Sequence, residues 1–172
     1  MPDYPSTQQL WAPWRMEFIR APRESGCFLC RIAGGTPDQD EDNLVIHRNG
    51  GMMLLLNRYP YNSGHLMVAP CRHVATLGEL TGEERRALLD MACLGEQLLQ
   101  AVVNPDGFNM GINQGSAAGA GLKEHLHWHV VPRWEGDTNF MPVLGRVRVM
   151  PQALSEMQAA LREALSRRGE VG

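Results

Sequence analysis

The segment EHLHWHVVPRW, residues 124–134, places a histidine at every second position, namely His125, His127 and His129. Alternate side chains of a β-strand point to the same face of a sheet. A strand through this segment therefore presents three imidazoles on one face and turns the apolar side chains between them toward a core. Taken alone, the three histidines allow a polar strand face, a metal site or a reactive site.

The loop before the histidines, NQGSAAGAG at residues 113–121, consists mostly of small residues. Small side chains let backbone N–H groups approach an anion closely and form a concave donor site for a phosphate group. Such a loop by itself is usually just a tight connection. Beside three imidazoles, however, it favours a site that holds a phosphate group and reacts with it.

The composition is that of a soluble globular protein: 172 residues, 44% of them hydrophobic and 20% charged, with a formal net charge of −3. This charge gives no electrostatic reason to expect nucleic acid or an acidic membrane as a partner. No apolar run approaches the roughly 18 residues of a membrane span, and the first residues lack the pattern of a secretion signal. We therefore expect a cytoplasmic protein. The acidic run DQDED, residues 38–42, is expected to be a solvated loop.

Hydrophobic periodicity predicts five strands and two main helices. The strands are expected at residues 43–48, 52–57, 65–70, 108–113 and 125–132. Between the first two, Asn49-Gly50 favours a tight hairpin turn. Thr81 and Glu84 form a capping box at the start of a long helix, and a last helix is expected to begin near Pro151. This order predicts an α+β fold with a mainly antiparallel sheet.

The sequence CFLC places Cys27 and Cys30 two residues apart. One chain segment can supply two thiolates to a tetrahedral metal ion with this gap. The same spacing also fits a redox pair or two unrelated thiols, and the chain has no second Cys-x-x-Cys. The remaining cysteines, Cys71 and Cys93, are expected to be small buried hydrophobic residues.

Residues 125–131 read HLHWHVV, a full match to His-φ-His-φ-His-φ-φ with φ apolar. This motif is the one that names the histidine triad (HIT) family of nucleotide hydrolases and transferases. LLLNRYPYNSGHLMVAPCRH, residues 54–73, resembles the strand–loop–strand of the same family. Residues 10–19 and 132–140 resemble a bacterial and archaeal branch that includes diadenosine tetraphosphate phosphorylases. The resemblance covers nearly the whole chain.

The resemblance implies a HIT-like α+β fold with a five-stranded antiparallel sheet, one long helix and a C-terminal helix. It implies one domain over residues 1–172, divided into an N-terminal segment with the cysteine pair, a catalytic core and a C-terminal helix, at residues 1–40, 41–150 and 151–172. Family members usually pair their sheets and long helices as homodimers. The apolar helix face from Leu88 to Val102 is consistent with such a homodimer.

In an enzyme of this family His127 is the nucleophile. A ring nitrogen of the neutral imidazole attacks the α-phosphorus of a nucleotide, and water or another acceptor then opens the nucleotidyl-histidine. The resemblance implies that His129 contacts the phosphate and protonates the leaving group, that Gln114 lies near the bridging oxygen and that His125 completes the catalytic set. It also implies nucleotide-binding residues: Asn57 at the ribose, His65 near the triad, and Asn113, Gly119, Ala120 and Gly121 in the loop.

Some HIT proteins complete a cysteine pair with two histidines, one after the Pro-x-x-His strand end and one from the triad. Carried onto this chain, the ligands of one structural zinc ion are Cys27, Cys30, His73 and His125, and no organic cofactor is implied. Two thiolates and two imidazoles are an ordinary ligand set for structural zinc. A zinc-bound His125 would stiffen the segment that presents His127.

The substrate implied by the resemblance is an adenine nucleotide, above all a dinucleoside polyphosphate such as diadenosine tetraphosphate. The acceptor is water in a hydrolase or inorganic phosphate in a phosphorylase. Some phosphorylases of the branch carry Gly-Ser just before the triad, where this chain reads AGAGLKE at residues 118–124. Hydrolysis of adenosine phosphoramidate and nucleotide-dependent regulation with little turnover are the alternatives.

Overall fold

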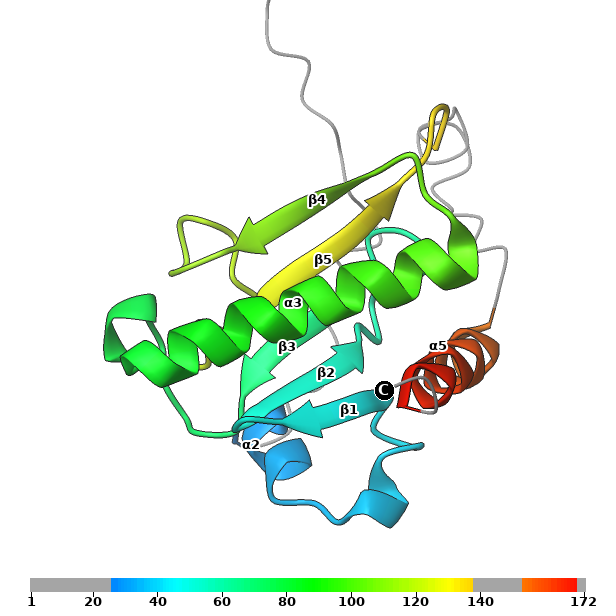
Figure 1. Ribbon diagram of the computed structural model, residues 1–172. Coiled ribbons are helices and arrows are strands. Elements are labelled where there is room, and N and C mark those ends of the chain that lie inside the picture. The colour runs from blue at the N-terminus through cyan, green and yellow to red at the C-terminus, as the bar shows by residue number, and fades with distance from the viewer. Residues whose placement is uncertain (1–25, 138–152, 170–172) are drawn as a thin grey trace, which may run out of the picture. The chain divides into compact units, whose positions relative to one another are not determined.

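The structure, a computed structural model, describes residues 26–137 and 153–169, all within one compact unit. Its five strands form one antiparallel sheet in the spatial order β1-β2-β3-β5-β4 (Figure 1). The strands are β1 (Val45–Asn49), β2 (Met52–Leu56), β3 (Leu66–Pro70), β4 (Gly107–Ile112) and β5 (Trp128–Arg133). The predicted α+β fold with a five-stranded antiparallel sheet is confirmed.

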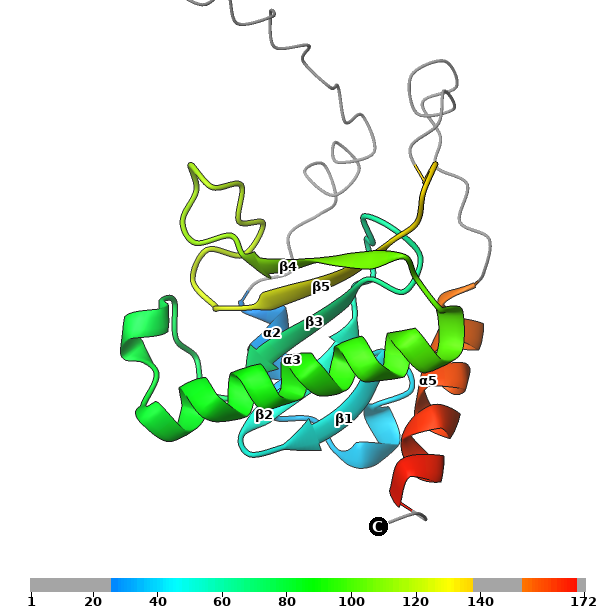
Figure 2. The same cartoon turned by 45° about the horizontal axis from the view of Figure 1, so that its top comes forward.

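Helices cover both faces of this sheet. The long helix α3 (Gly82–Val103) lies across one face and the short helix α2 (Phe28–Ala33) lies on the other (Figures 1 and 2). The last helix, α5 (Leu154–Gly169), contacts α3 and the edge strand β1. No helix in the described part of the chain is long and apolar enough to cross a bilayer.

The turn between β1 and β2 is one residue later than predicted. Asn49 pairs with Met52, so the two central residues are Gly50 and Gly51. Both have positive φ, +56° and +73°. A two-residue turn with positive φ at both centres matches the twist of the strands that it joins, and glycine adopts this conformation at little steric cost.

The start of α3 confirms the predicted capping box. The Thr81 hydroxyl accepts a hydrogen bond from the Glu84 backbone N–H at 3.1 Å, and the Glu84 carboxylate accepts one from the Thr81 N–H at 2.8 Å. Two of the N–H groups that a helix start leaves without helical partners are thereby satisfied.

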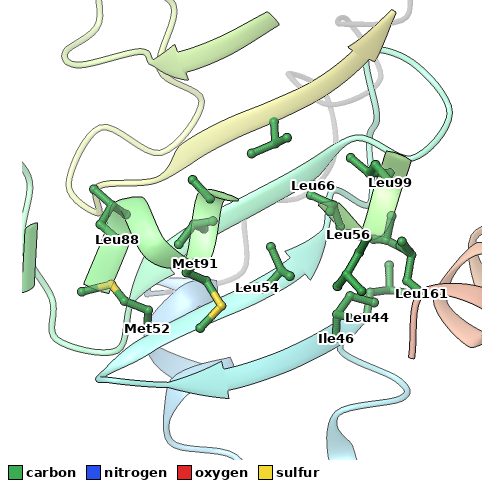
Figure 3. Packing of buried hydrophobic residues seen from close by; sticks show 14 of the residues in the cluster. Leu44, Ile46, Met52, Leu54, Leu56, Leu66, Leu88, Met91, Leu99 and Leu161 are labelled. Atoms are coloured by element: carbon green, nitrogen blue, oxygen red, sulfur yellow. The ribbon is translucent and has the colours of Figure 1, made fainter. Parts of the chain in front are cut away.

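The apolar face of α3 packs onto the sheet of its own chain (Figure 3). Its buried side chains are Leu88, Met91, Ala92, Leu98 and Leu99. Gly95 allows the close approach, because a Cβ at this position would lie 3.1 Å from Leu54 Cδ1. This face is therefore buried within its own chain. It is not available for the homodimer interface that the sequence analysis considered.

The strand predicted through all three triad histidines begins only at Trp128, so His125 and His127 precede it. Pairing of β3 with β5 stops at Val68 and Trp128. Further on, Pro70 has no N–H to donate to a ladder. The side chains of this segment nevertheless alternate as predicted, with Leu126 and Val130 buried on the α3 side of the sheet.

The acidic run at residues 38–42 is not a fully solvated loop. Asp40 is buried, and its carboxylate accepts a hydrogen bond from the Arg48 guanidinium at 2.6 Å. The same guanidinium donates to the Ile32 carbonyl at 2.8 Å. Arg48 thus connects β1 to the C-terminal turn of α2, the helix that begins at the cysteine pair.

Candidate active site and metal centre

The four predicted zinc ligands meet at one end of the sheet. Cys27 precedes the first residue of α2, Cys30 lies in its first turn, His73 follows β3 and His125 precedes β5. One Sγ or ring nitrogen from each residue lies within 4.8 Å of all the others. The chain therefore brings together, from three separate segments, two thiols and two imidazoles that the sequence spacing alone could not place.

Hydrogen bonding prepares His125 to bind a metal through Nδ1. Its Nε2 lies 2.8 Å from the Pro70 carbonyl oxygen, which can only accept, so Nε2 carries the proton. The unprotonated Nδ1 faces Cys27 Sγ at 3.1 Å and Cys30 Sγ at 3.4 Å. Burial lowers the pKa of His125, against the opposing effect of the bond to Pro70, and this favours the neutral ring that a metal requires.

The spacing of these donor atoms fits a zinc ion. Zinc–sulfur and zinc–nitrogen bonds in a tetrahedral site place S and N about 3.5 Å apart. His73 Nδ1 lies 3.1 Å from Cys30 Sγ, close to this value. The bond from His125 to a backbone carbonyl is the outer contact that metal-bound histidines usually make. The other two cysteines lie outside this cluster. Both were expected to be buried, but Cys71 is only half-buried and Cys93 on α3 is exposed.

His127 is held as a neutral imidazole with one defined lone pair. Its Nδ1 lies 2.9 Å from the carbonyl oxygen of His125, so Nδ1 carries the proton and Nε2 keeps the lone pair. His127 is buried, and this burial lowers its pKa against the opposing effect of the hydrogen bond to His125. A neutral, oriented imidazole is the state in which histidine acts as a nucleophile.

His129 lies beside His127 and pairs with His65. The rings of His127 and His129 meet edge to face, with centroids 4.9 Å apart. On its other side His129 Nδ1 lies 2.9 Å from His65 Nε2. Asn57 also belongs to this group, because its side-chain amide lies 3.4 Å from His65 Nδ1. Its Oδ1 accepts the Tyr59 N–H at 2.9 Å, which is the strand-end role available to such an asparagine.

Asn113 and Gln114 directly follow β4 and reach the same end of the sheet as the triad, because Gly111 pairs with His129. Gln114 is exposed, and its side-chain oxygen accepts the Leu77 N–H at 3.3 Å. The following loop borders an open pocket of about 600 Å³, next to the metal centre. Residues that line this pocket include His73, Glu79, Gly115, Ser116, Lys123 and Glu124.

The small-residue loop uses some of its own N–H groups. Gly119 N–H donates to the Ser116 carbonyl at 3.0 Å, and Ala120 N–H donates to the Gly115 carbonyl at 3.3 Å. These two donors therefore stabilise the loop and do not project as a phosphate nest in this conformation. Gly121, the third loop residue predicted to bind nucleotide, is exposed beyond this turn.

Comparison with known proteins shows the family to which the chain belongs. The HIT domain family matches residues 38–136, more than half of the chain. The chain belongs to the HIT family. It is 40% identical over 160 residues to the AP-4-A phosphorylase of Mycobacterium tuberculosis, a match that covers 90% of this chain and 82% of that protein. It is an enzyme of the HIT family.

Solved HIT structures are similar over the same fold. A Zn-bound histidine triad family protein from Mycobacterium smegmatis superposes with a TM-score of 0.68 at 27% identity, over 86% of this chain and 98% of that one. A hypothetical histidine triad nucleotide-binding protein from Sulfolobus tokodaii matches with a TM-score of 0.63 at 23% identity, over 82% and 93%, and supports the fold alone. Cys27 and Cys30 lie outside the residues matched by the HIT domain.

Tyr61 is a site residue that the sequence analysis did not single out. Its ring centroid lies 4.6 Å from that of His65 and 5.6 Å from that of His129. Its backbone N–H also donates to His65 Nδ1 at 3.0 Å. The only sequence signal is its position four residues before the His65 of the Gly-His pair, which does not reveal a ring contact with the distant His129.

Proposed function

We propose that this HIT enzyme cleaves adenine dinucleotides at the α-phosphorus through a nucleotidyl-His127 intermediate. The observation that carries the proposal is the state of His127: a buried neutral ring whose Nδ1 donates to the His125 carbonyl and whose Nε2 keeps its lone pair. The relationship to the AP-4-A phosphorylase of Mycobacterium tuberculosis favours diadenosine tetraphosphate as substrate.

In the first step the Nε2 lone pair of His127 forms a bond to the α-phosphorus, and the bond from that phosphorus to the bridging oxygen breaks. The electron pair leaves with the bridging oxygen, which receives a proton from His129. In the second step an acceptor oxygen forms the new bond to phosphorus, gives a proton to His129 and releases His127. One difficult displacement is thereby divided into two easier ones.

The other predicted residues bind and orient the substrate in this proposal. Asn57 and His65 hold the ribose side of the nucleotide near the triad, with Asn113 from the end of β4. Gln114 lies near the bridging oxygen. The loop at Gly119, Ala120 and Gly121 faces the phosphate chain, and the N–H groups of Gly119 and Ala120 must exchange their internal bonds if they are to contact it.

Zinc has a structural role in this proposal. Bound by Cys27, Cys30, His73 and His125, it would supply a rigid cross-link, because protein ligands fill all four positions. The residues themselves position the chemistry, since the carbonyl oxygen of ligand His125 holds Nδ1 of His127. The single Cys2His2 cluster of the described residues is compatible with one zinc ion per chain, and the M. smegmatis relative is a Zn-bound member of the family.

We also propose that the enzyme is a cytoplasmic homodimer. The buried face of α3 is not available for the interface, so the contact must use other surfaces. Exposed apolar side chains remain at Leu89 on α3 and at Met110 on the edge strand β4. Light scattering after size exclusion tests this: a mass of twice 19.1 kDa is expected, and a mass equal to one chain contradicts it.

The decisive experiment incubates the zinc-loaded protein with diadenosine tetraphosphate, with and without inorganic phosphate. Products ATP and AMP that do not depend on phosphate identify a hydrolase, and ATP and ADP that require phosphate identify a phosphorylase. A stable AMP adduct on His127, captured by acid-free quenching and mass spectrometry, identifies the covalent route.

The His127→Ala variant is the control for this experiment. It should lose both turnover and adduct while it keeps its zinc content. Turnover that persists in this variant contradicts the assignment of the nucleophile. If the wild-type protein binds AMP but turns over no adenine nucleotide, including the phosphoramidate, the protein is a regulator and the proposal is wrong.

A further inference from the structure

Tyr61 lies between solvent and a buried pair of histidines. Its side chain is 37% exposed, whereas His65 is 0% exposed and His129 is 8% exposed. The ring of Tyr61 contacts both, tilted by 34° to His65 and by 37° to His129. The Tyr61 ring therefore contacts both imidazoles that this hydrogen bond joins.

The backbone of Tyr61 also determines where the protons of this pair lie. A peptide N–H can only donate, so the 3.0 Å contact from Tyr61 N–H makes Nδ1 of His65 an acceptor without a proton. The remaining ring proton of His65 is therefore on Nε2, which donates to Nδ1 of His129 at 2.9 Å. Since Nδ1 of His129 accepts, its own proton is on Nε2.

We propose that Tyr61 is a positioning residue that holds His129 in the Nε2–H form. Its N–H sets the direction of the hydrogen bond from His65 to His129, and its ring keeps water from that bond. The proton of His129 is thereby held on the ring nitrogen that does not face His65. The role of His129 as the proton donor to the leaving oxygen rests on the proposed function, whereas the tautomer itself does not.

The ring matters because water competes for both nitrogens of an exposed imidazole. In a covered site the hydrogen bond between His65 and His129 is stronger and one tautomer is favoured. Loss of the ring admits water, and His129 can then exchange between its two neutral forms. Only the Nε2–H form can protonate a group on the side away from His65, so the competent fraction of the enzyme falls.

Nitrogen NMR of the zinc-loaded full chain tests the tautomer directly. Long-range correlation of ring protons with ¹⁵N-labelled imidazoles distinguishes Nδ1–H from Nε2–H, and a His129→Asn variant assigns the signal. We expect Nε2–H for His129 in the wild type and in Tyr61→Phe, which keeps the ring. We expect a mixture in Tyr61→Ala, which removes it.

A second variant, His65→Phe, removes the donor while the Tyr61 ring stays in place. It should also abolish the single tautomer of His129, and melting curves of all variants establish that they are folded. A wild-type His129 with its proton on Nδ1 overturns the hydrogen-bond direction. An unchanged Nε2–H signal in Tyr61→Ala overturns the role of the ring.

Kinetics provides the independent arm of the test. General-acid assistance contributes roughly a hundredfold or more to such a reaction, so kcat of Tyr61→Ala should fall in proportion to the fraction of His129 that the NMR signal shows as Nε2–H, with little change in KM. Tyr61→Phe should restore kcat. A fall confined to KM contradicts the positioning role. Failure of the proposed function appears differently, as absent turnover in the wild type with the tautomer intact.

Discussion

The carbonyl oxygen of His125 accepts a hydrogen bond from Nδ1 of His127 at 2.9 Å, while Nδ1 of His125 faces Cys27. One residue therefore connects the candidate metal centre to the candidate nucleophile, through its side chain at one end and its backbone carbonyl at the other. A change of ligand at the metal centre should for this reason alter how His127 is held.

Replacement of Cys27 by serine should remove zinc and lower stability. A metal that binds only the folded chain stabilises it by about 4 kcal/mol at a thousandfold excess over Kd, and this stabilisation should be lost together with most of the activity. Metal content by atomic emission and thermal melting with and without a chelator measure the effect. Cys93→Ser, at an exposed thiol outside the cluster, is the matched control and should retain zinc.

The acid limb of the pH–rate profile should reflect His127. Attack requires the neutral ring, and burial lowers the pKa of His127 below the ordinary value of about 6.5. As pH falls, kcat/KM should therefore decline only below pH 6.5, when the lowered pKa is passed. The profile of the zinc-loaded enzyme between pH 4.5 and about pH 8 checks this. A half-maximal point above 6.5 on the acid side contradicts a depressed pKa.

Replacement of Arg48 by alanine should destabilise the fold by about 2–3 kcal/mol, because it leaves the buried Asp40 carboxylate and the Ile32 carbonyl without this donor. Urea unfolding gives the change. Arg167→Ala removes an exposed ion pair with Glu163 and should change the free energy of unfolding by less than about 0.5 kcal/mol. Equal losses of unfolding free energy in the two variants would show that the buried contact with Asp40 stabilises the fold no more than the exposed ion pair does.

Gly64→Ala should be far more damaging than Gly51→Ala. Both glycines have positive φ, +76° and +73°, which costs a side-chain-bearing residue about 1 kcal/mol. At Gly64 the added Cβ also meets Leu99 Cδ2 at 2.8 Å, whereas at Gly51 it meets nothing within 4 Å. Overpacking adds roughly 1–3 kcal/mol. Thermal melting of the two variants separates the steric effect from the backbone effect. Identical melting temperatures contradict an added steric cost at Gly64.

The sequence predicted much of the fold because its signals are local. Thr81 and Glu84 satisfy helix N–H groups three residues apart. Asn49-Gly50 predicted a tight hairpin turn, although its centre lies one residue later, at Gly50 and Gly51. Alternation along residues 125–131 likewise determined which side chains face the core. The alternating pattern extended the predicted fifth strand back to His125 and His127. The observed strand is shorter, because Pro70 of the neighbouring strand β3 has no N–H to donate to the ladder.

The sequence by itself determined the residue types of the site and the order of the elements. Only the tertiary structure decided which groups meet: Cys27 with His125 across 98 positions, and His65 with His129 across 64. It also decided their tautomers, since each proton position follows from a contact with a backbone group or a neighbouring ring. Such contacts depend on strand register and loop path, which the chain sets only when the sheet and α3 have packed around their common core.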